Sequence, residues 1–344
     1  MKLNKILPLL ALGTASLTFT SCENGDSVFS DYEGGTSVYF AYQYPVRTLV
    51  LGNDEYNNER DNAHKCAIYS TMGGAYSGRN ITLDIKVDNS LCDNLYFENG
   101  SPVLPMPSEY YSLLGNQIKY NGELTGFVEV QFTDAYFNDP KAITNNYVIP
   151  VVITGQTGAD RILSGTPLIE GDTPSRTNAA LWSVAPKDYV LYCVKYKNPW
   201  DAFYLRRGKD VISEGGVTSE VVRHGASVEK DEVCSIGTRS LTTAVFPVTT
   251  ADNSGNAVTC DLLLNFNGDE CTVTSGTDGI SISGSGKFVE NGEKKAWGNK
   301  DRDAIYLDYT ISMGSKTIAT KDTLVLQTRG TNKLEVFTPK YVEN

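Results

Sequence analysis

Strict alternation of apolar and polar residues is the feature that most constrains how this chain can fold. Between Ile81 and Asp88 the apolar residues Ile81, Leu83, Ile85 and Val87 take every second position, which is the period of a half-buried β-strand. Similar short runs, bounded by turn residues, recur at 37–42, 65–69, 127–132, 147–153, 190–197, 244–248, 258–266, 304–311 and 323–326. Residues 187–344 offer no long amphipathic helix, so the sequence predicts an all-β protein.

The first 22 residues depart from this pattern. Lys2 and Lys5 precede a short apolar run at 6–12, and small residues then lead to Cys22. A basic start, a short apolar centre and small residues before a cut site are typical of a cleaved export signal, whereas a membrane span needs about 18 apolar residues. We therefore expect residues 1–21 to be a signal peptide.

The end of this segment, Thr20-Ser21-Cys22, resembles the lipobox of bacterial lipoproteins, although Phe19 stands where leucine is usual. The resemblance implies that Cys22 becomes the N-terminus and that its thiol carries diacylglycerol, followed by a polar tether at 22–35. Each buried CH2 of an acyl chain contributes about 0.8 kcal/mol to membrane binding. We expect an outer-membrane lipoprotein, on either the surface or the periplasmic face. The alternative is ordinary secretion with a free Cys22.

The charge balance argues against nucleic acid as a partner. Two of the 30 basic residues lie in the leader, so 28 remain against 41 acidic residues, a formal charge of −13. A phosphate backbone is bound by clustered Lys and Arg, and here basic pairs such as Arg206-Arg207 stand isolated among acids. An acidic surface of this kind chiefly favours solubility.

Six cysteines follow the leader, namely Cys66, Cys92, Cys193, Cys234, Cys260 and Cys271. An even number in an exported protein permits disulfides, but a chain of this length does not need them for stability. If residues 267–268 form a two-residue hairpin turn, Leu264 faces Cys271, and Cys260 lies about 13 Å further along. That distance is too long for a disulfide. No Cys/His zinc spacing occurs, so we expect no cysteine metal site.

Composition divides the chain into two β-domains. Residues 36–170 fit an Ig-like β-sandwich, because short strands alternate with turn clusters about every ten residues. Residues 171–186 are rich in Gly, Asp, Thr, Pro, Ser and Asn, and we expect them to be the linker. Residues 187–344 then predict an antiparallel β-barrel or a second sandwich.

Several motifs carry a family resemblance across nearly the whole mature chain. Runs at 37–40, 104–111, 126–130 and 147–151 resemble an uncharacterised Ig-like domain of Bacteroidetes lipoproteins, and runs at 283–288, 297–307 and 321–325 resemble its C-terminal partner domain. The first domain occurs beside genes for polysaccharide use, sometimes ahead of a glycosidase domain. The resemblance implies a calycin-like barrel for the second domain, and any function drawn from such neighbours is analogy.

The sequence predicts neither catalysis nor a cofactor. No nucleophile–base motif accompanies the two histidines, and the carboxylate-rich strand of the chitinase-like hydrolases is absent. The runs 53–62 and 299–303 hold many side-chain oxygens, yet Ala304 replaces the glycine that a calcium loop requires. We interpret both runs as polar loops and expect no metal site, with a bound calcium ion as the alternative for either run.

Aromatic residues are the remaining candidates for a binding site. Sugars stack their C–H faces on Trp or Tyr and direct their hydroxyls at planar polar groups. Trp200 follows the turn at Asn198-Pro199, Tyr204 and Arg206 come at strand spacing, and Trp297 lies in another polar turn. These four residues form the predicted glycan site, with packing in the core as the alternative for each tryptophan. Trp182 is expected to pack between the domains.

Together these features predict a lipid-anchored, non-catalytic glycan-binding component of a polysaccharide-utilisation system. Oligosaccharide or polysaccharide and other envelope proteins are the expected partners. A structural or adhesive scaffold is the first alternative, and it would present an exposed apolar or edge-strand surface. A glycoside hydrolase with dispersed carboxylates is the second, and it requires two positioned carboxyl groups.

Overall fold

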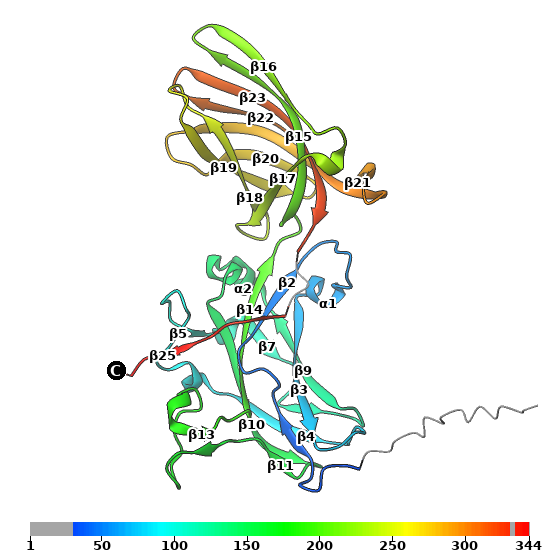
Figure 1. The fold of residues 1–344 in the computed structure, drawn as a ribbon, viewed down its shortest axis with the longest axis vertical. Helices are drawn as coiled ribbons and strands as arrows, with labels where there is room; N and C mark the ends of the chain where they lie inside the picture. Colours follow the sequence, from blue (N-terminus) through cyan, green and yellow to red (C-terminus); the bar gives the residue numbers. More distant parts are fainter. Residues whose placement is uncertain (1–29, 331–333, 344) are drawn as a thin grey trace, which may run out of the picture.

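The computed structural model describes residues 30–330 and 334–343, so the export signal and Cys22 lie outside the described residues. The chain is all-β, as predicted, and forms two units stacked end to end (Figure 1). The strands of the N-terminal unit are β1 (Ser37–Tyr39), β2 (Pro45–Val50), β3 (Lys65–Gly73), β4 (Thr82–Val87), β5 (Leu95–Tyr96), β6 (Leu104–Pro105), β7 (Tyr111–Leu113), β8 (Gln117–Lys119), β9 (Thr125–Phe132), β10 (Tyr147–Thr157), β11 (Arg161–Ile162), β12 (Thr166–Pro167), β13 (Trp182–Val184) and β14 (Tyr189–Lys197). Two short helices, α1 (Glu59–Asn62) and α2 (Asp134–Asn138), lie between them.

Most of these strands join one curled mixed sheet, so the two layers of the predicted sandwich are linked by continuous pairing. The path runs β11-β1-β3-β9-β8-β4-β10-β14-β2-β24, where β24 is Glu335–Val336. The pairs β1–β11, β10–β6 and β14–β2 are parallel. The alternation in β4 buries Leu83 and Ile85, as the sequence predicts, but Val87 at the end of the strand is 38% exposed. The curled sheet encloses a core with Phe40, Tyr136 and Val151.

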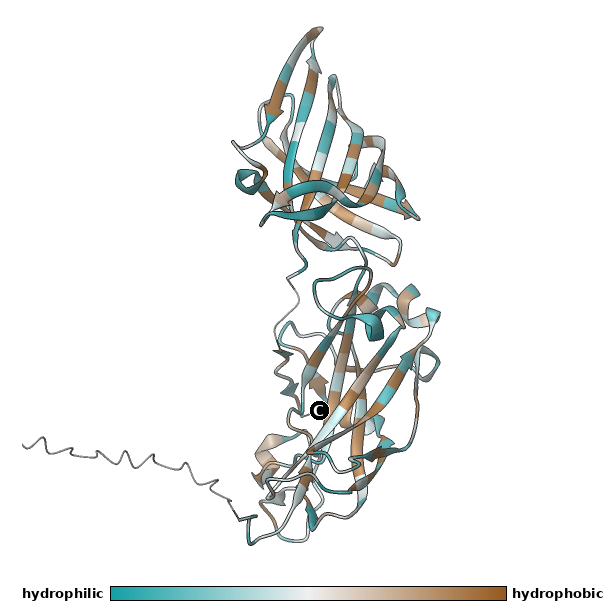
Figure 2. Cartoon of the chain, turned by 90° about the vertical axis from the view of Figure 1, so that its right-hand side faces the viewer, coloured by the Kyte–Doolittle hydropathy of each residue, from teal (hydrophilic) through white to brown (hydrophobic). Residues whose placement is uncertain are grey.

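The C-terminal unit is an antiparallel β-barrel. Its strands are β15 (Ala202–Glu214), β16 (Val217–Arg223), β17 (Glu232–Thr238), β18 (Thr243–Ala251), β19 (Ala257–Asn267), β20 (Glu270–Ser275), β21 (Ser281–Trp297), β22 (Lys300–Met313) and β23 (Lys316–Thr328). They follow one another in the sheet except that β16 lies outside β15, and pairing of β15 with β23 closes the barrel. Hydrophilic and hydrophobic residues alternate along the barrel strands (Figure 2).

The barrel is inserted into the N-terminal unit, which corrects both predicted domain boundaries. Strand β14 pairs with β10 and β2, so residues 189–197 belong to the N-terminal sheet and the chain crosses into the barrel at 198–201. After the barrel, β24 pairs with β2 and β25 (Lys340–Tyr341) pairs with β5. The alternation at 190–197 identifies a strand, but it does not reveal which sheet the strand joins.

The expected linker at 171–186 is part of the N-terminal unit. Its β13 pairs with β12, and the indole Nε1 of Trp182 donates a 2.9 Å hydrogen bond to the carbonyl oxygen of Ser175. Trp182 is therefore held within its own loop, and the expectation that it packs between the domains is wrong. Its partners are local because the loop folds back on itself.

All six cysteines of the described chain are free thiols, and five of them are buried. The β19–β20 hairpin turns at Gly268 and Asp269, so Cys271 pairs with Phe266 rather than with the predicted Leu264. Cys260 pairs with Val248 on the other side. Within the described residues, no helix has the length and apolar character to cross a membrane.

Candidate functional site

Two of the four predicted glycan-site residues belong to the barrel core. Trp200 is 8% exposed, and its ring stacks on that of Phe266 with centroids 3.7 Å apart and planes at 6°. Tyr204 is 1% exposed, and its hydroxyl donates to the Trp200 carbonyl oxygen at 2.9 Å. Neither ring can serve as a platform for a sugar, so their predicted role is wrong. The turn before Trp200 indicated exposure, but Phe266, distant in sequence, covers the indole.

Arg206 lies on the same barrel face as Tyr204, as its spacing predicts, but that face is the interior, where both side chains are buried. Its Nε and Nη2 donate to Asp322 Oδ2 at 3.1 and 2.9 Å, and Nη2 also donates to the Tyr309 hydroxyl at 3.2 Å. Burial opposes the charge of Arg206, but the Asp322 carboxylate outweighs burial and raises the arginine pKa. Arg206 therefore does not join Trp200 or Trp297 in a surface site.

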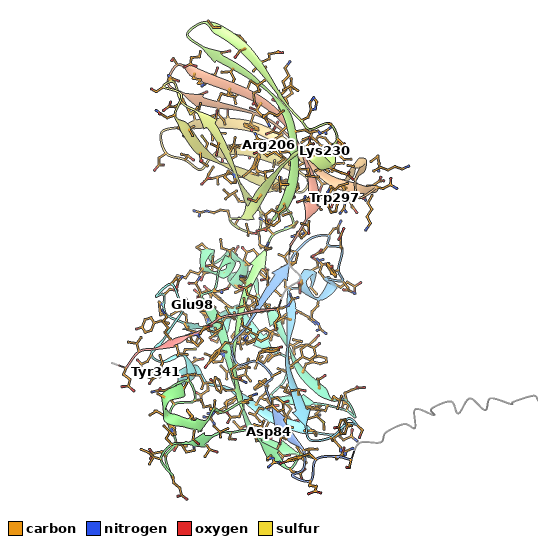
Figure 3. The ribbon with its side chains drawn as sticks, in the orientation of Figure 1. Asp84, Glu98, Arg206, Lys230, Trp297 and Tyr341 are labelled. Carbon is orange, nitrogen blue, oxygen red and sulfur yellow. The ribbon has the colours of Figure 1, made fainter. Side chains whose placement is uncertain are left out.

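Trp297 alone lies near a surface site, at the end of the barrel that faces the N-terminal unit (Figure 3). The ring is half-buried, and the Arg302 guanidinium stands over it at 4.8 Å from the centroid. Arg302 Nη1 also donates to Glu55 Oε1 of the N-terminal unit at 2.8 Å. Arg302 therefore connects Trp297 to the 53–58 loop.

That loop and the barrel end form a cleft of about 620 Å³, which we call the interdomain cleft. Its walls come from three segments. They are Asn53, Asp54, Glu55, Tyr56 and Asn58; Glu290, Asn291, Lys300, Asp301, Arg302 and Asp303; and Leu326, Gln327, Thr328, Arg329 and Gly330. Both polar runs that sequence analysis treated as separate loops therefore contribute to one site.

Arg329 holds together the backbone segments that meet where the N-terminal unit joins the barrel, beside the interdomain cleft. Its guanidinium, 5% exposed, donates to the carbonyl oxygens of Leu51 and Asn53 at 3.0 and 2.9 Å. It also donates to those of Asn198 and Asp201 at 2.7 and 2.9 Å. Burial lowers the pKa of Arg329. One buried cation thus joins the 51–53 segment to the crossing that leads into the barrel.

Three carboxylates of the cleft already accept hydrogen bonds from the protein. Glu55 accepts from Arg302, and Asp303 Oδ1 accepts from the Asn291 backbone N–H at 2.8 Å. Asp301 accepts from the backbone N–H of Lys295 at 3.0 Å, and this hydrogen bond holds the Asp301 pKa below its usual range. The ionised form of Asp301 suits an acceptor of hydroxyl hydrogens and not a general acid, which needs a raised pKa.

Tyr56 is the aromatic residue of the cleft that sequence analysis missed. It is 59% exposed, and it lies next to Glu55, which Arg302 holds against the barrel. In the sequence it is one tyrosine of 20, within a polar run, and it carries no local mark of a site. The sequence signal that could have indicated a sugar-binding role for Tyr56 was its position as an aromatic residue among Asn, Asp and Glu side chains.

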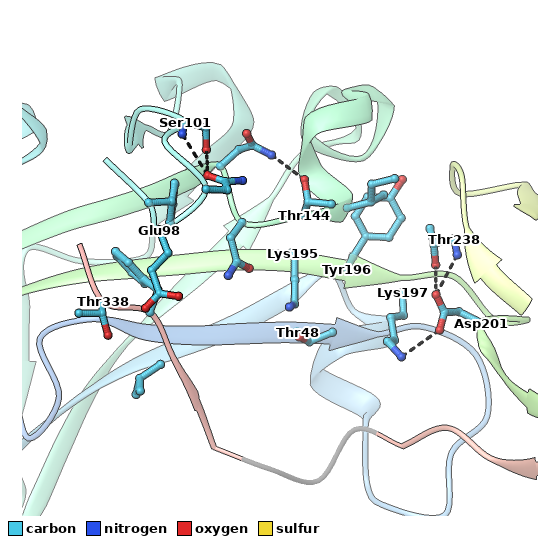
Figure 4. Close-up of a pocket in the computed structure, with 17 residues that line it drawn as sticks. Thr48, Glu98, Ser101, Thr144, Lys195, Tyr196, Lys197, Asp201, Thr238 and Thr338 are labelled. Carbon is cyan, nitrogen blue, oxygen red and sulfur yellow. Dashed lines mark hydrogen bonds and ion pairs between the residues drawn. The ribbon is translucent and has the colours of Figure 1, made fainter. Parts of the chain in front are cut away.

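A second groove of about 680 Å³ also borders the junction (Figure 4). Lys195 pairs with Glu335 at 2.8 Å, and Lys197 pairs with Asp201 at 2.9 Å. Its aromatic residues, Phe97, Tyr196 and Phe337, are all buried. The groove therefore lacks an exposed ring, and the interdomain cleft is the better candidate for sugar stacking. Within the described chain, no group of three or more His, Cys, Asp or Glu residues could hold a metal ion.

Comparison with known proteins agrees with the two-unit architecture. A family model for a domain of unknown function, DUF5627, matches residues 199–330, and a model described as an N-terminal domain matches residues 32–160. A crystal structure of a Bacteroides ovatus protein of unknown function is 45% identical with a TM-score of 0.85. The alignment covers 91% of this chain and all of that one. The chain belongs to the family of this Bacteroides protein.

Membership of this family brings no activity with it, because the function of the Bacteroides ovatus relative is unknown. A multidomain protein that includes DUF1735, also from Bacteroides ovatus, is 10% identical over 87% of this chain and 99% of its own, with a TM-score of 0.39. A candidate carbohydrate-binding protein from the same organism is 10% identical over 90% and 98%, with a TM-score of 0.26. Scores this low support no inference about this chain. No curated protein matches it.

Proposed function

We propose that this protein is a lipid-anchored component of the bacterial cell envelope that binds glycan in the interdomain cleft without converting it. The observation that carries the proposal is the cleft itself, where the exposed ring of Tyr56 stands among amide, carboxylate and guanidinium groups. This combination suits a saccharide, whose C–H face stacks on an aromatic ring while its hydroxyls need planar polar partners. Trp297 does not line the cleft, but its ring supports Arg302, which does.

Binding fits the cleft better than hydrolysis does. A glycosidase needs one carboxylic acid with a raised pKa and a second carboxylate positioned across the scissile bond. Glu55 is paired with Arg302, Asp303 accepts from a backbone N–H, and the pKa of Asp301 is lowered. These carboxylates are arranged as fixed hydrogen-bond acceptors.

The position of the two units suits an anchored binding protein. The described chain begins at the end of the N-terminal unit that lies away from the barrel (Figure 1). A lipid on Cys22 would therefore leave the curled sheet between the membrane and the cleft. In the proposal, the N-terminal unit acts as the spacer that presents the site.

A glycan array tests the proposal. The soluble protein starting at Glu23 would be compared with Tyr56→Ala and Trp297→Ala, and with Tyr42→Ala as the matched control. Tyr42 is 52% exposed and does not line the cleft. We expect an array signal that Tyr56→Ala abolishes, that Trp297→Ala weakens and that Tyr42→Ala retains. A folded wild-type protein that binds nothing, or equal signals from all variants, contradicts the proposal.

One observation favours a second function, a scaffold that contacts other envelope proteins. Among the described residues, β16 pairs only with β15, and it carries Val217, Val221 and Val222, which are 70%, 43% and 62% exposed. An unpaired edge with exposed apolar residues can add a strand from another chain. Crosslinking in the envelope that Val222→Lys removes, together with a silent glycan array, would establish this function instead.

A further inference from the structure

A pair of exposed aromatic rings lies on the outer face of the N-terminal sheet. Tyr69 of β3 and Phe127 of β9 are cross-strand neighbours, and their ring centroids are 5.2 Å apart with the planes tilted by 43°. They are 50% and 43% exposed, whereas Ile68 and Val128, one position along each strand, belong to the core. Among the aromatic ring pairs of the described chain, this is the one in which both rings are exposed. Contiguous exposed apolar surface marks a binding face, whereas single exposed residues do not.

Charged side chains border this aromatic pair. Arg60 of α1 stands over the Phe127 ring at 5.5 Å from the centroid, and its Nη1 donates to the Tyr69 hydroxyl at 3.3 Å. Glu129 forms ion pairs with Arg60 Nε at 3.7 Å and with Lys65 Nζ at 3.6 Å. The side chains of Arg60 and Glu129 are 41% and 31% exposed, so a guanidinium and a carboxylate can both reach a ligand. Exposed rings beside planar polar groups are the combination that suits a sugar.

The aromatic pair is connected to the interdomain cleft by the 53–58 loop and by α1, which leads into β3 at the end of the sheet nearer the barrel (Figure 1). Tyr56 lies four residues before Arg60, so their Cα atoms are at most about 14 Å apart. Asn58 Nδ2 donates to the Val50 carbonyl oxygen of β2 at 2.8 Å, and Asp61 Oδ2 accepts from the Val50 backbone N–H at 2.8 Å. Because these bonds fix the connection on β2, the cleft and the aromatic pair are held at a short separation.

The charges along this path favour an uncharged ligand. Five carboxylates and three cations line the interdomain cleft, which leaves an excess of two negative charges there. Beside the aromatic pair, Arg60 and Lys65 share the carboxylate of Glu129, which leaves an excess of one positive charge. Because the two ends of the path carry opposite signs, a chain with many like charges would be repelled at one of them.

We infer that the aromatic pair is a second sugar subsite, and that the ligand of the interdomain cleft is a neutral polysaccharide long enough to reach it. The inference rests on the proposed function and adds the class of ligand, a polymer rather than a short oligosaccharide. One stretch of the chain stacks on Tyr56 and a later stretch on Tyr69 and Phe127, with Arg60 between them. Two contacts in one ligand strengthen binding, because the second contact forms intramolecularly.

Native affinity electrophoresis of the soluble protein starting at Glu23 tests this inference. The probes are β-glucan, xyloglucan, galactomannan, arabinoxylan and amylopectin, with polygalacturonate as the charged comparison. Tyr69→Ala and Phe127→Ala each remove one ring of the pair. Tyr76→Ala is the matched control, because Tyr76 is 68% exposed and follows β3 in a loop, where its backbone N–H donates to Asp31 at 3.2 Å. Circular dichroism would verify that all variants fold.

We expect at least one neutral polysaccharide to retard the wild type and Tyr76→Ala equally, and each ring variant to raise the dissociation constant about fivefold or more. Retardation that both ring variants leave unchanged overturns the inference, as does a wild type that no polymer retards or that polygalacturonate alone retards.

The failure of this inference can be told apart from the failure of the proposed function. A glycan signal that Tyr56→Ala abolishes and both ring variants leave intact would keep the interdomain cleft as a site and overturn the inference alone. Retardation that depends on Tyr69 and Phe127 but not on Tyr56 would remove the cleft from the path and overturn both.

Discussion

Replacement of Arg329 by methionine tests how the two units are held together. The side chain is buried, and its guanidinium donates to four carbonyl oxygens at 2.7 to 3.0 Å, two in the 51–53 segment and two in the 198–201 crossing. Methionine keeps much of the volume and removes every donor. A hydrogen bond contributes about 1 kcal/mol net, and more when the donor is charged. Water in the adjacent cleft can reach part of the exposed acceptors, so we expect a loss of about 4 kcal/mol.

Half of these bonds reach the N-terminal unit, so about 2 kcal/mol of that loss is coupling between the units. The total loss of about 4 kcal/mol should lower the onset of thermal unfolding in Arg329→Met by about 8–16 °C, at about 2–4 °C per kcal/mol for domains of this size. Urea unfolding, followed by circular dichroism and tryptophan fluorescence, should change from coincident to separate transitions.

The control is Arg239→Met, because Arg239 is exposed and makes no side-chain hydrogen bond or ion pair within the described chain. We expect it to remain within about 0.5 kcal/mol of the wild type. If Arg329→Met unfolds like Arg239→Met, with coincident transitions, the buried guanidinium does not couple the units.

Three further predictions concern the barrel, the thiols and the anchor. Burial opposes ionisation of Asp210, but hydrogen bonds from Arg223 outweigh burial and hold the Asp210 pKa below its usual range. The stability that ionised Asp210 contributes should therefore persist above about pH 4 and be lost as the pH falls further. Asp210→Asn should be less stable at pH 7, and its urea midpoint should change less between pH 5 and 3; an unchanged pH slope would contradict this. Burial raises the pKa of the Cys66 and Cys193 thiols to about 12. A thiol reagent should therefore label the native protein starting at Glu23 slowly, and should label six cysteines in denaturant, whereas fewer labelled sites would reveal a disulfide. Cys22→Ala should move the full-length protein from the membrane fraction to the soluble fraction, and continued attachment would refute the lipid anchor.

The alternation of residues was sufficient to predict the fold class, because a period of two reports which side chains share a face of a strand. It predicted the buried positions of Leu83 and Ile85 in β4, though not the exposure of Val87, and the common face of Tyr204 and Arg206. It could not reveal that this face is the barrel interior, or that β14 pairs with β10 in the N-terminal unit. Pairing between distant strands depends on the whole core, which no local window contains.

The candidate site shows the same limit. The polar runs around Tyr56 and Asp301 are visible in the sequence, but 245 residues separate them, and only the inserted barrel brings them together. The turn at 198–199 suggested that Trp200 is exposed, yet Phe266 covers it. Trp297 remains near the site because its partner Arg302 bridges to Glu55 across the junction.

The most direct test of glycan binding in the interdomain cleft is isothermal titration calorimetry with the glycan that gives the strongest array signal. We predict a saturable isotherm for the wild type, an unchanged one for Tyr42→Ala, and a dissociation constant raised about tenfold or more for Tyr56→Ala, since loss of an aromatic anchor typically costs more than about 1 kcal/mol. An isotherm that Tyr56→Ala leaves unchanged would contradict the account, because the exposed ring is the feature on which it depends.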